Sequence, residues 1–130
     1  MGYVNRSITR ITLLACLLIL AGCAASNTPA QAIEAYIEAL VAKNVNQLVN
    51  AACSDWEEGA RQELRTFDAV TVSLQDLACQ ETSRQDGSAH VACQGKIVAN
   101  YGNEILELDL AERAYLAVNE GGEWRMCGYP

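Results

Sequence analysis

The spacing of apolar residues changes near residue 70, and this change constrains the fold more than any other feature of the chain. Between residues 29 and 67, apolar side chains recur every three or four positions, as they do on one face of a helix. From Val70 onward they alternate with polar residues, as in strands with one buried face. Helices followed by antiparallel strands predict an α+β fold, with the N-terminal helices packed on one face of a sheet.

Three helices are expected before residue 70. Thr28-Pro29 supplies a capping hydroxyl and a proline at the first position of a helix over residues 29–42. Asn44 is placed to cap a second, short helix. Ser54 and Glu57 have the spacing of a capping box, which predicts that a third helix begins near Ser54. The apolar face of the second helix is expected to consist of Val45, Leu48, Val49 and Ala52.

The second half of the chain predicts an antiparallel meander with turns at Asp86-Gly87, Gly102-Asn103 and Gly121-Gly122. The alternation changes phase near Gln75-Asp76, which predicts a bulge there. Residues 104–119 are expected to form one long strand with a bend near residues 111–113. Its buried face is expected to consist of Leu106, Leu108, Leu110, Leu116 and Val118.

The amino-terminal region has the order of a secretory signal. Arg6 and Arg10 precede an apolar run over residues 11–21, and no acidic residue occurs before Cys23. This run is shorter than the roughly 20 apolar residues that a membrane-spanning helix needs. The segment Leu20-Ala21-Gly22-Cys23 resembles the lipobox of bacterial lipoproteins. That resemblance implies cleavage before Cys23 and a diacylglyceryl group on its side chain.

Cleavage there divides the chain into a signal peptide over residues 1–22, a lipidated N-terminus and short tether over residues 23–28, and one domain over residues 29–130. Because two arginines and no acidic residue are lost, the net charge changes from −7 to −9. This charge excludes nucleic-acid binding and disfavours electrostatic adhesion to anionic lipid. The lipid on Cys23 is therefore the expected membrane contact, on the outside of the plasma membrane or at an outer membrane.

Four cysteines of the mature chain predict two disulfides, because an even number is typical of small exported domains. Three pairings are open. Cys79 and Cys93 lie seven residues on either side of position 86, so they would face each other across a hairpin centred there. This favours a Cys79–Cys93 bridge and leaves Cys53 with Cys127. The alternative, a zinc site, is disfavoured because no C-x-x-C pair occurs, and no metal is expected.

The order of elements resembles the nuclear transport factor 2-like superfamily, also called cystatin-like. The residues that carry the resemblance are PAQAIEAYIEAL over residues 29–40, NVNQL over residues 44–48 and GEWRM over residues 122–126. The resemblance covers about residues 29–127. It implies a curved sheet that wraps the first helix and encloses a conical pocket. Members include isomerases, dehydratases, ligand binders and sheet-mediated dimers, and the fold alone does not choose among them.

Candidates for chemistry in such a pocket have simpler interpretations. Tyr36 lies on the apolar face of the first helix, where core packing explains it. His90 alternates with the apolar Val91 and is expected to face solvent. No G-x-S-x-G, H-E-x-x-H, phosphate loop or dinucleotide glycine run is present, so no catalytic set and no cofactor are expected. The full set of candidates consists of Tyr36, Asp55, His90, Tyr101, Asp109 and Tyr115.

The leading hypothesis is a lipid-anchored, extracytoplasmic binding or interaction module of the bacterial cell envelope, without enzymatic activity. Its pocket is expected to take a small apolar ligand, or the module binds a protein partner. Two alternatives stay open: a pocket enzyme of the isomerase or hydratase type that uses Tyr36, Asp109 or His90, and a structural protein that forms a homodimer through its sheet. The expected pocket residues are Tyr36, Leu40, Leu108 and Trp124.

Overall fold

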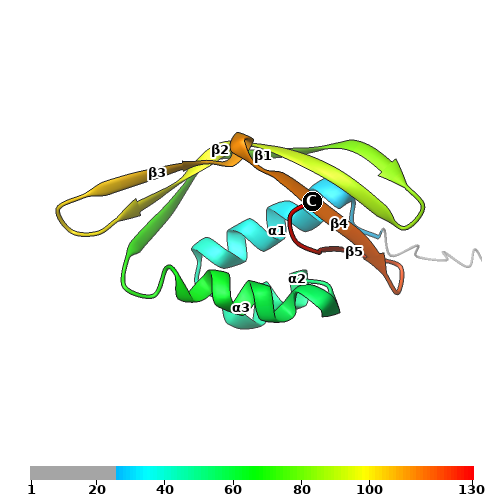
Figure 1. The fold of residues 1–130 in the computed structure, drawn as a ribbon, viewed down its shortest axis with the longest axis horizontal. Helices are drawn as coiled ribbons and strands as arrows, with labels where there is room; N and C mark the ends of the chain where they lie inside the picture. Colours follow the sequence, from blue (N-terminus) through cyan, green and yellow to red (C-terminus); the bar gives the residue numbers. More distant parts are fainter. Residues whose placement is uncertain (1–25) are drawn as a thin grey trace, which may run out of the picture.

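The computed structural model describes residues 26–130 (Figure 1). The expected signal peptide and Cys23 therefore lie outside the described residues. None of the helices within residues 26–130 combines the length and the apolarity that crossing a membrane requires. The helices are α1 (Pro29–Val41), α2 (Val45–Ala51) and α3 (Glu57–Arg65), with short 3-10 helices η1 (Ser54–Trp56) and η2 (Leu110–Glu112). The strands are β1 (Thr71–Gln85), β2 (Ser88–Asn100), β3 (Ile105–Asp109), β4 (Ala114–Glu120) and β5 (Glu123–Met126).

The helices cover one face of a curved antiparallel sheet, so the α+β class and the helix-on-sheet arrangement are confirmed (Figure 1). The helix α1 lies against the sheet and contacts β1, β2, β4 and β5. The helix α2 packs on α1, and α3 packs on α2. The sheet therefore wraps the first helix, and the other two helices form an outer layer below it (Figure 1).

Local sequence signals explain where α1 and α2 begin. The Thr28 hydroxyl accepts a hydrogen bond from the Gln31 amide at 3.1 Å, and the Gln31 side chain accepts one from the Thr28 amide at 2.9 Å. Asn44 caps α2 in the same way, by accepting from the Gln47 amide at 3.1 Å. The predicted face of α2 is wrong at Val45, which is 40% exposed. Val45 occupies the first turn of this seven-residue helix, whereas the buried contacts begin one turn later at Leu48.

The predicted capping box of the third helix is wrong. Ser54 begins η1, and its backbone amide and its hydroxyl both donate to the Glu120 carboxylate, each at 3.1 Å. The α-helix begins three residues later, at Glu57. Gly59 is required within it because a Cβ atom there would lie 2.8 Å from the Trp56 ring. The contact that shapes this helix is therefore between its own first turn and an aromatic ring, not a cap.

The strand β2 is the centre of the sheet. It pairs with β1 along its length, with β4 over Ser88–Ala92 and with β3 over Lys96–Asn100. A two-residue turn at Asp86-Gly87 joins β1 and β2, as predicted. The predicted bulge in β1 is also present, since the register shifts between Gln75 and Ala78. Gly95 faces it across the ladder, where a Cβ atom would lie 2.4 Å from the Gln75 carbonyl oxygen.

The expected long strand over residues 104–119 is divided by η2 into β3 and β4. The bend is where it was predicted, but the predicted buried face is wrong at Leu106, which is 45% exposed, and throughout the second half. Tyr115 and Ala117 are buried in β4, whereas Leu116 and Val118 are only partly buried. The one-turn helix η2 breaks the alternation. Even-numbered residues face inward before it, whereas odd-numbered residues face inward in β4. Simple alternation across a break therefore misassigns every side chain beyond it.

Two disulfides join the hairpin and the ends of the domain. Cys79 and Cys93 are directly opposite in β1 and β2 and are bonded to each other. Cys53, after α2, is bonded to Cys127, just after β5. This is the pairing that the hairpin spacing favours. Cys127 reaches Cys53 because the Cys53 amide donates to the Met126 carbonyl at 2.7 Å, which aligns the two segments.

Candidate functional site

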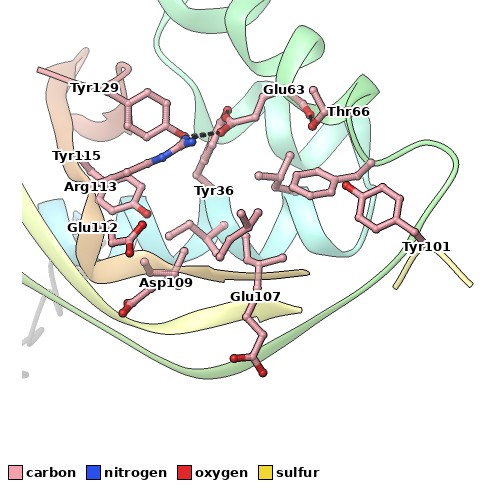
Figure 2. A pocket seen from close by; sticks show the side chains of 16 residues that line it. Tyr36, Glu63, Thr66, Tyr101, Glu107, Asp109, Glu112, Arg113, Tyr115 and Tyr129 are labelled. Carbon is pink, nitrogen blue, oxygen red and sulfur yellow. Dashed lines mark hydrogen bonds and ion pairs between the residues drawn. The ribbon is translucent and has the colours of Figure 1, made fainter. Parts of the chain in front are cut away.

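A cavity of about 310 Å³ lies between α1, α3 and the inner face of the sheet (Figure 2). The first helix contributes its second half, β2 and β3 contribute one wall, and η2 with β4 contributes the other. This is the place that a curved sheet leaves open when it wraps a single helix. The apolar part of the lining consists of Ile37, Leu40, Phe67, Ile97, Leu108 and Leu110.

Three of the four expected pocket residues line this cavity, namely Tyr36, Leu40 and Leu108. Trp124 does not. It lies on β5 beside the N-terminal end of α1, where its backbone amide and carbonyl each make a 2.8 Å hydrogen bond with the Asn27 side chain. The alternation along β5 correctly predicts that Trp124 is buried. However, Trp124 is buried near the start of α1, whereas the cavity is lined by the second half of that helix.

A carboxylate on α3 forms the polar part of the site. Glu63 accepts a hydrogen bond from the Tyr36 hydroxyl at 2.6 Å through one oxygen and another from the Tyr129 hydroxyl through the second. The Trp56 indole donates to the Tyr36 hydroxyl at 3.1 Å. Glu63 is only 19% exposed, so it is a nearly buried acid whose two oxygens are both occupied by phenols (Figure 2).

The tyrosines of the site are held in their neutral form. Burial, with the Glu63 carboxylate as the second cause, raises the pKa of the Tyr36 and Tyr129 hydroxyls far above the ordinary value. Burial also raises the pKa of Tyr115 to about 12. Each hydroxyl therefore remains a hydrogen-bond donor at neutral pH, and none is poised to act as a base.

Arg113 supplies the positive charge of the lining. Its guanidinium nitrogen lies 3.8 Å from a Glu63 oxygen, and its central carbon lies 5.1 Å from the Tyr129 ring centroid. The Arg113 side chain is 59% exposed, so solvent screens its ion pair with Glu63. This ion pair therefore restrains the guanidinium only weakly. Arg113 is thus a partly solvated cation at the edge of an aromatic surface.

The catalytic candidates separate into two groups. Tyr36, Tyr101, Asp109 and Tyr115 line the cavity, whereas Asp55 and His90 are exposed elsewhere. One Asp109 carboxylate oxygen accepts from the Ala111 amide at 2.9 Å, which makes it the cap of η2. No three His, Cys, Asp or Glu side chains in the described part of the chain are grouped as a metal ion would require.

Three important residues of the site were not expected: Glu63, Arg113 and Tyr129. Glu63 could have been found, because it lies three residues after Ala60 and four before Phe67, which places it on the same side of a helix as these two apolar residues. An acid on an apolar face is a signal of a polar partner inside. Tyr129 follows the last strand, and no periodicity reaches it.

Comparisons with known proteins found similarity only to solved structures of low sequence identity. No family model and no curated protein matches the chain. A solved chain whose name begins with Rd1NTF2_05 is 11% identical, with a TM-score of 0.45, over 74% of this chain and 89% of that one. A protein of unknown function with a cystatin-like fold, from Nostoc punctiforme PCC 73102, is 12% identical, with a TM-score of 0.43, over 74% of this chain and 80% of that one.

Proposed function

We propose that the chain is a lipid-anchored, extracytoplasmic module of the bacterial cell envelope that binds a small, largely apolar ligand in the cavity. The observation that carries the proposal is the cavity itself. It has about 310 Å³ of space, and its lining combines apolar side chains with polar and charged groups from several elements, as a site that binds and orients a ligand requires.

The occupied state of Glu63 favours binding over catalysis. A general base must reach a substrate proton with a free oxygen. Both Glu63 oxygens already accept phenol hydrogen bonds, and the Tyr36 hydroxyl is further held by Trp56. This network orients the wall of the cavity and stabilises a negative charge there without exposing it to a reaction.

The sequence and the start of the domain support the anchor. Only three residues separate Cys23 from Asn27, whose side chain is bonded to β5, so an acylated Cys23 would hold this end of the domain at the membrane. The cavity is lined by the other half of α1, roughly 16 Å along the helix from Pro29 to Leu40 at 1.5 Å per residue. Two disulfides agree with an oxidising compartment.

The binding proposal is tested by filling the cavity. Leu108→Trp places an indole in it, whereas Leu106→Trp, on the same strand, adds the same group at a site that is 45% exposed. Native mass spectrometry of the purified chain should detect a bound small molecule in the wild type and in Leu106→Trp, and none in Leu108→Trp. Equal occupancy in both variants would place the ligand elsewhere.

The anchor is tested separately. Intact mass spectrometry of membrane-extracted protein should give a chain that begins at Cys23 and carries acyl mass. The Cys23→Ser variant should lack that mass and leave the membrane fraction. A mature chain without acyl groups would refute the anchor and leave the binding proposal untouched.

The enzyme alternative has one observation in its favour, which is the convergence of Tyr36 and Glu63 at an open cavity. If the site performs proton transfer, Tyr36→Phe should abolish turnover of a bound ligand while leaving its affinity nearly unchanged. A bound ligand recovered chemically unaltered after prolonged incubation would favour the binding module.

The dimer alternative is favoured by the exposed edge strand β3, where Ile105 is 64% exposed and Leu106 is 45% exposed. Light scattering of the Cys23→Ser chain should give the mass of two protomers if this strand pairs with a second copy. Ile105→Lys should then restore a single protomer.

A further inference from the structure

The aromatic residues of this chain are concentrated at the cavity. The chain contains eight aromatic side chains, and five of them line this one space. Four are tyrosines whose hydroxyls add polarity without charge, and one is the chain's single phenylalanine. The rings come from α1, the loop after α3, the end of β2, β4 and the C-terminal segment, so the tertiary fold gathers them. They are Tyr36, Phe67, Tyr101, Tyr115 and Tyr129.

The charge of the lining is negative. The lining residues include four carboxylates and one guanidinium, a formal sum of −3 before their partners outside the lining are counted. Two of the acids are already paired: Glu107 with Lys96 at 2.8 Å, and Glu63 with its phenols. Glu112 makes no ion pair with any residue of the described region, so its charge is not locally neutralised. The chain as a whole adds to the same sign, with a net charge of −7.

Arg113 shows how these rings interact with a cation. Its guanidinium carbon lies 5.1 Å from the Tyr129 ring centroid, within the distance at which a cation is attracted by an aromatic face. The chain's own cation thus occupies one such position from the edge, at 59% exposure. Four other aromatic rings line the cavity, and Arg113 is the one basic residue among the lining residues.

We propose that the ligand of this cavity is a small organic ammonium compound with an apolar body, for example a quaternary or tertiary amine. Rings and carboxylates both favour positive charge, and an apolar wall favours a hydrocarbon body. This inference rests on the proposed binding function and specifies the chemistry of its ligand. The same charges disfavour carboxylate and phosphate compounds.

The test compares three six-carbon probes that differ only in the head group: hexyltrimethylammonium, 1-hexanol and hexanoate. Isothermal titration calorimetry with the Cys23→Ser chain should give an affinity for the ammonium probe at least about 10-fold above that for hexanol, since one cation–π contact is of that order. Hexanoate should bind more weakly than hexanol. The ammonium affinity should also fall as salt is raised, because the carboxylates contribute to it.

Variants of exposed lining residues assign the effect to the cavity. Tyr101 is 49% exposed, so its substitution leaves the fold intact. Tyr101→Leu should weaken ammonium binding about 3-fold to 10-fold without changing hexanol binding, and Tyr101→Phe should restore it, because the ring rather than the hydroxyl is required. Arg113→Gln should strengthen ammonium binding, since it removes the competing cation.

The outcomes separate the two proposals. If hexanol binds and the ammonium probe binds no more tightly, the cavity is a ligand site and the ammonium inference is wrong. Stronger binding of hexanoate, or its loss in Arg113→Gln, would overturn the inference in favour of an anionic ligand. If no probe binds, both the inference and the proposed binding function are overturned.

Discussion

The phenol–carboxylate network predicts a large difference between two chemically identical substitutions. Tyr36 and Tyr115 are both buried and both line the cavity, at 0% and 2% exposure. The Tyr36 hydroxyl donates to Glu63 at 2.6 Å and accepts from Trp56 at 3.1 Å. The Tyr115 hydroxyl makes no hydrogen bond with any other described residue. Replacement of each by phenylalanine removes one oxygen and leaves the ring in place.

The expected cost follows from what each oxygen holds. A hydrogen bond to a charged group contributes about 1.5–3 kcal/mol, and an unpaired buried donor costs about 1 kcal/mol or more. Glu63 keeps the Tyr129 hydrogen bond and some solvent, which places Tyr36→Phe in the lower part of the summed range. We expect Tyr36→Phe to lower the free energy of unfolding by about 2.5–3 kcal/mol and Tyr115→Phe to change it by less than about 0.5 kcal/mol.

Urea unfolding of the oxidised Cys23→Ser chain measures both values. The slope of the unfolding free energy against urea should be the same in both variants, which shows that the denatured states are comparable. Equal destabilisation by the two substitutions would refute the reasoning, because it would mean that the hydroxyl's partners contribute nothing beyond the loss of a buried oxygen.

Three further predictions concern stability. Gly59→Ala should lower it by about 1–2 kcal/mol despite the better helix propensity of alanine, because the new Cβ would lie 2.8 Å from the Trp56 ring; a higher melting temperature would contradict this. Asn27→Ala should accelerate hydrogen exchange of the Trp124 amide and cost about 1–2 kcal/mol; unchanged exchange would show that the contact is weak. Burial raises the pKa of Tyr115 from 10.0 to about 12, so the folded state keeps a proton that the unfolded state releases. The contribution of Tyr115 to stability should therefore be complete below pH 10 and decline by about 1.4 kcal/mol per pH unit between pH 10 and 12, as measured by urea unfolding at a series of pH values; an unfolding free energy that does not change over this range would contradict it.

The elements of the fold were predictable where they depend on neighbours a few residues apart. The cap at Thr28, the turn at Asp86-Gly87 and the bulge near Gln75 each follow from local backbone requirements. The Cys79–Cys93 bridge was predictable for the same reason, since a two-residue turn sets the register of a hairpin. Alternation failed beyond η2, because a single turn of helix reversed the parity of the strand that follows it.

The site was predictable in its apolar part and in four of its polar residues, Tyr36, Tyr101, Asp109 and Tyr115. Tyr36, Leu40 and Leu108 follow from helical and strand periodicity, which identifies inward faces. Periodicity does not state which inward residues leave a space between them, so Trp124 was assigned to a cavity that lies at the other end of α1. Helical spacing places Glu63 beside apolar residues, but its phenol partners Tyr36 and Tyr129 are distant in the chain and follow only from the tertiary structure.

The sequence by itself determined the class of the fold and its order of elements, because caps, turns and apolar spacing act over a few residues. Only the tertiary structure decided where the cavity lies and what lines it. Tyr36, Glu63, Arg113 and Tyr129 come from four separate segments. They meet because the sheet curves around α1 and because a disulfide next to Tyr129 holds the C-terminal segment against α3, and neither effect is local in the chain.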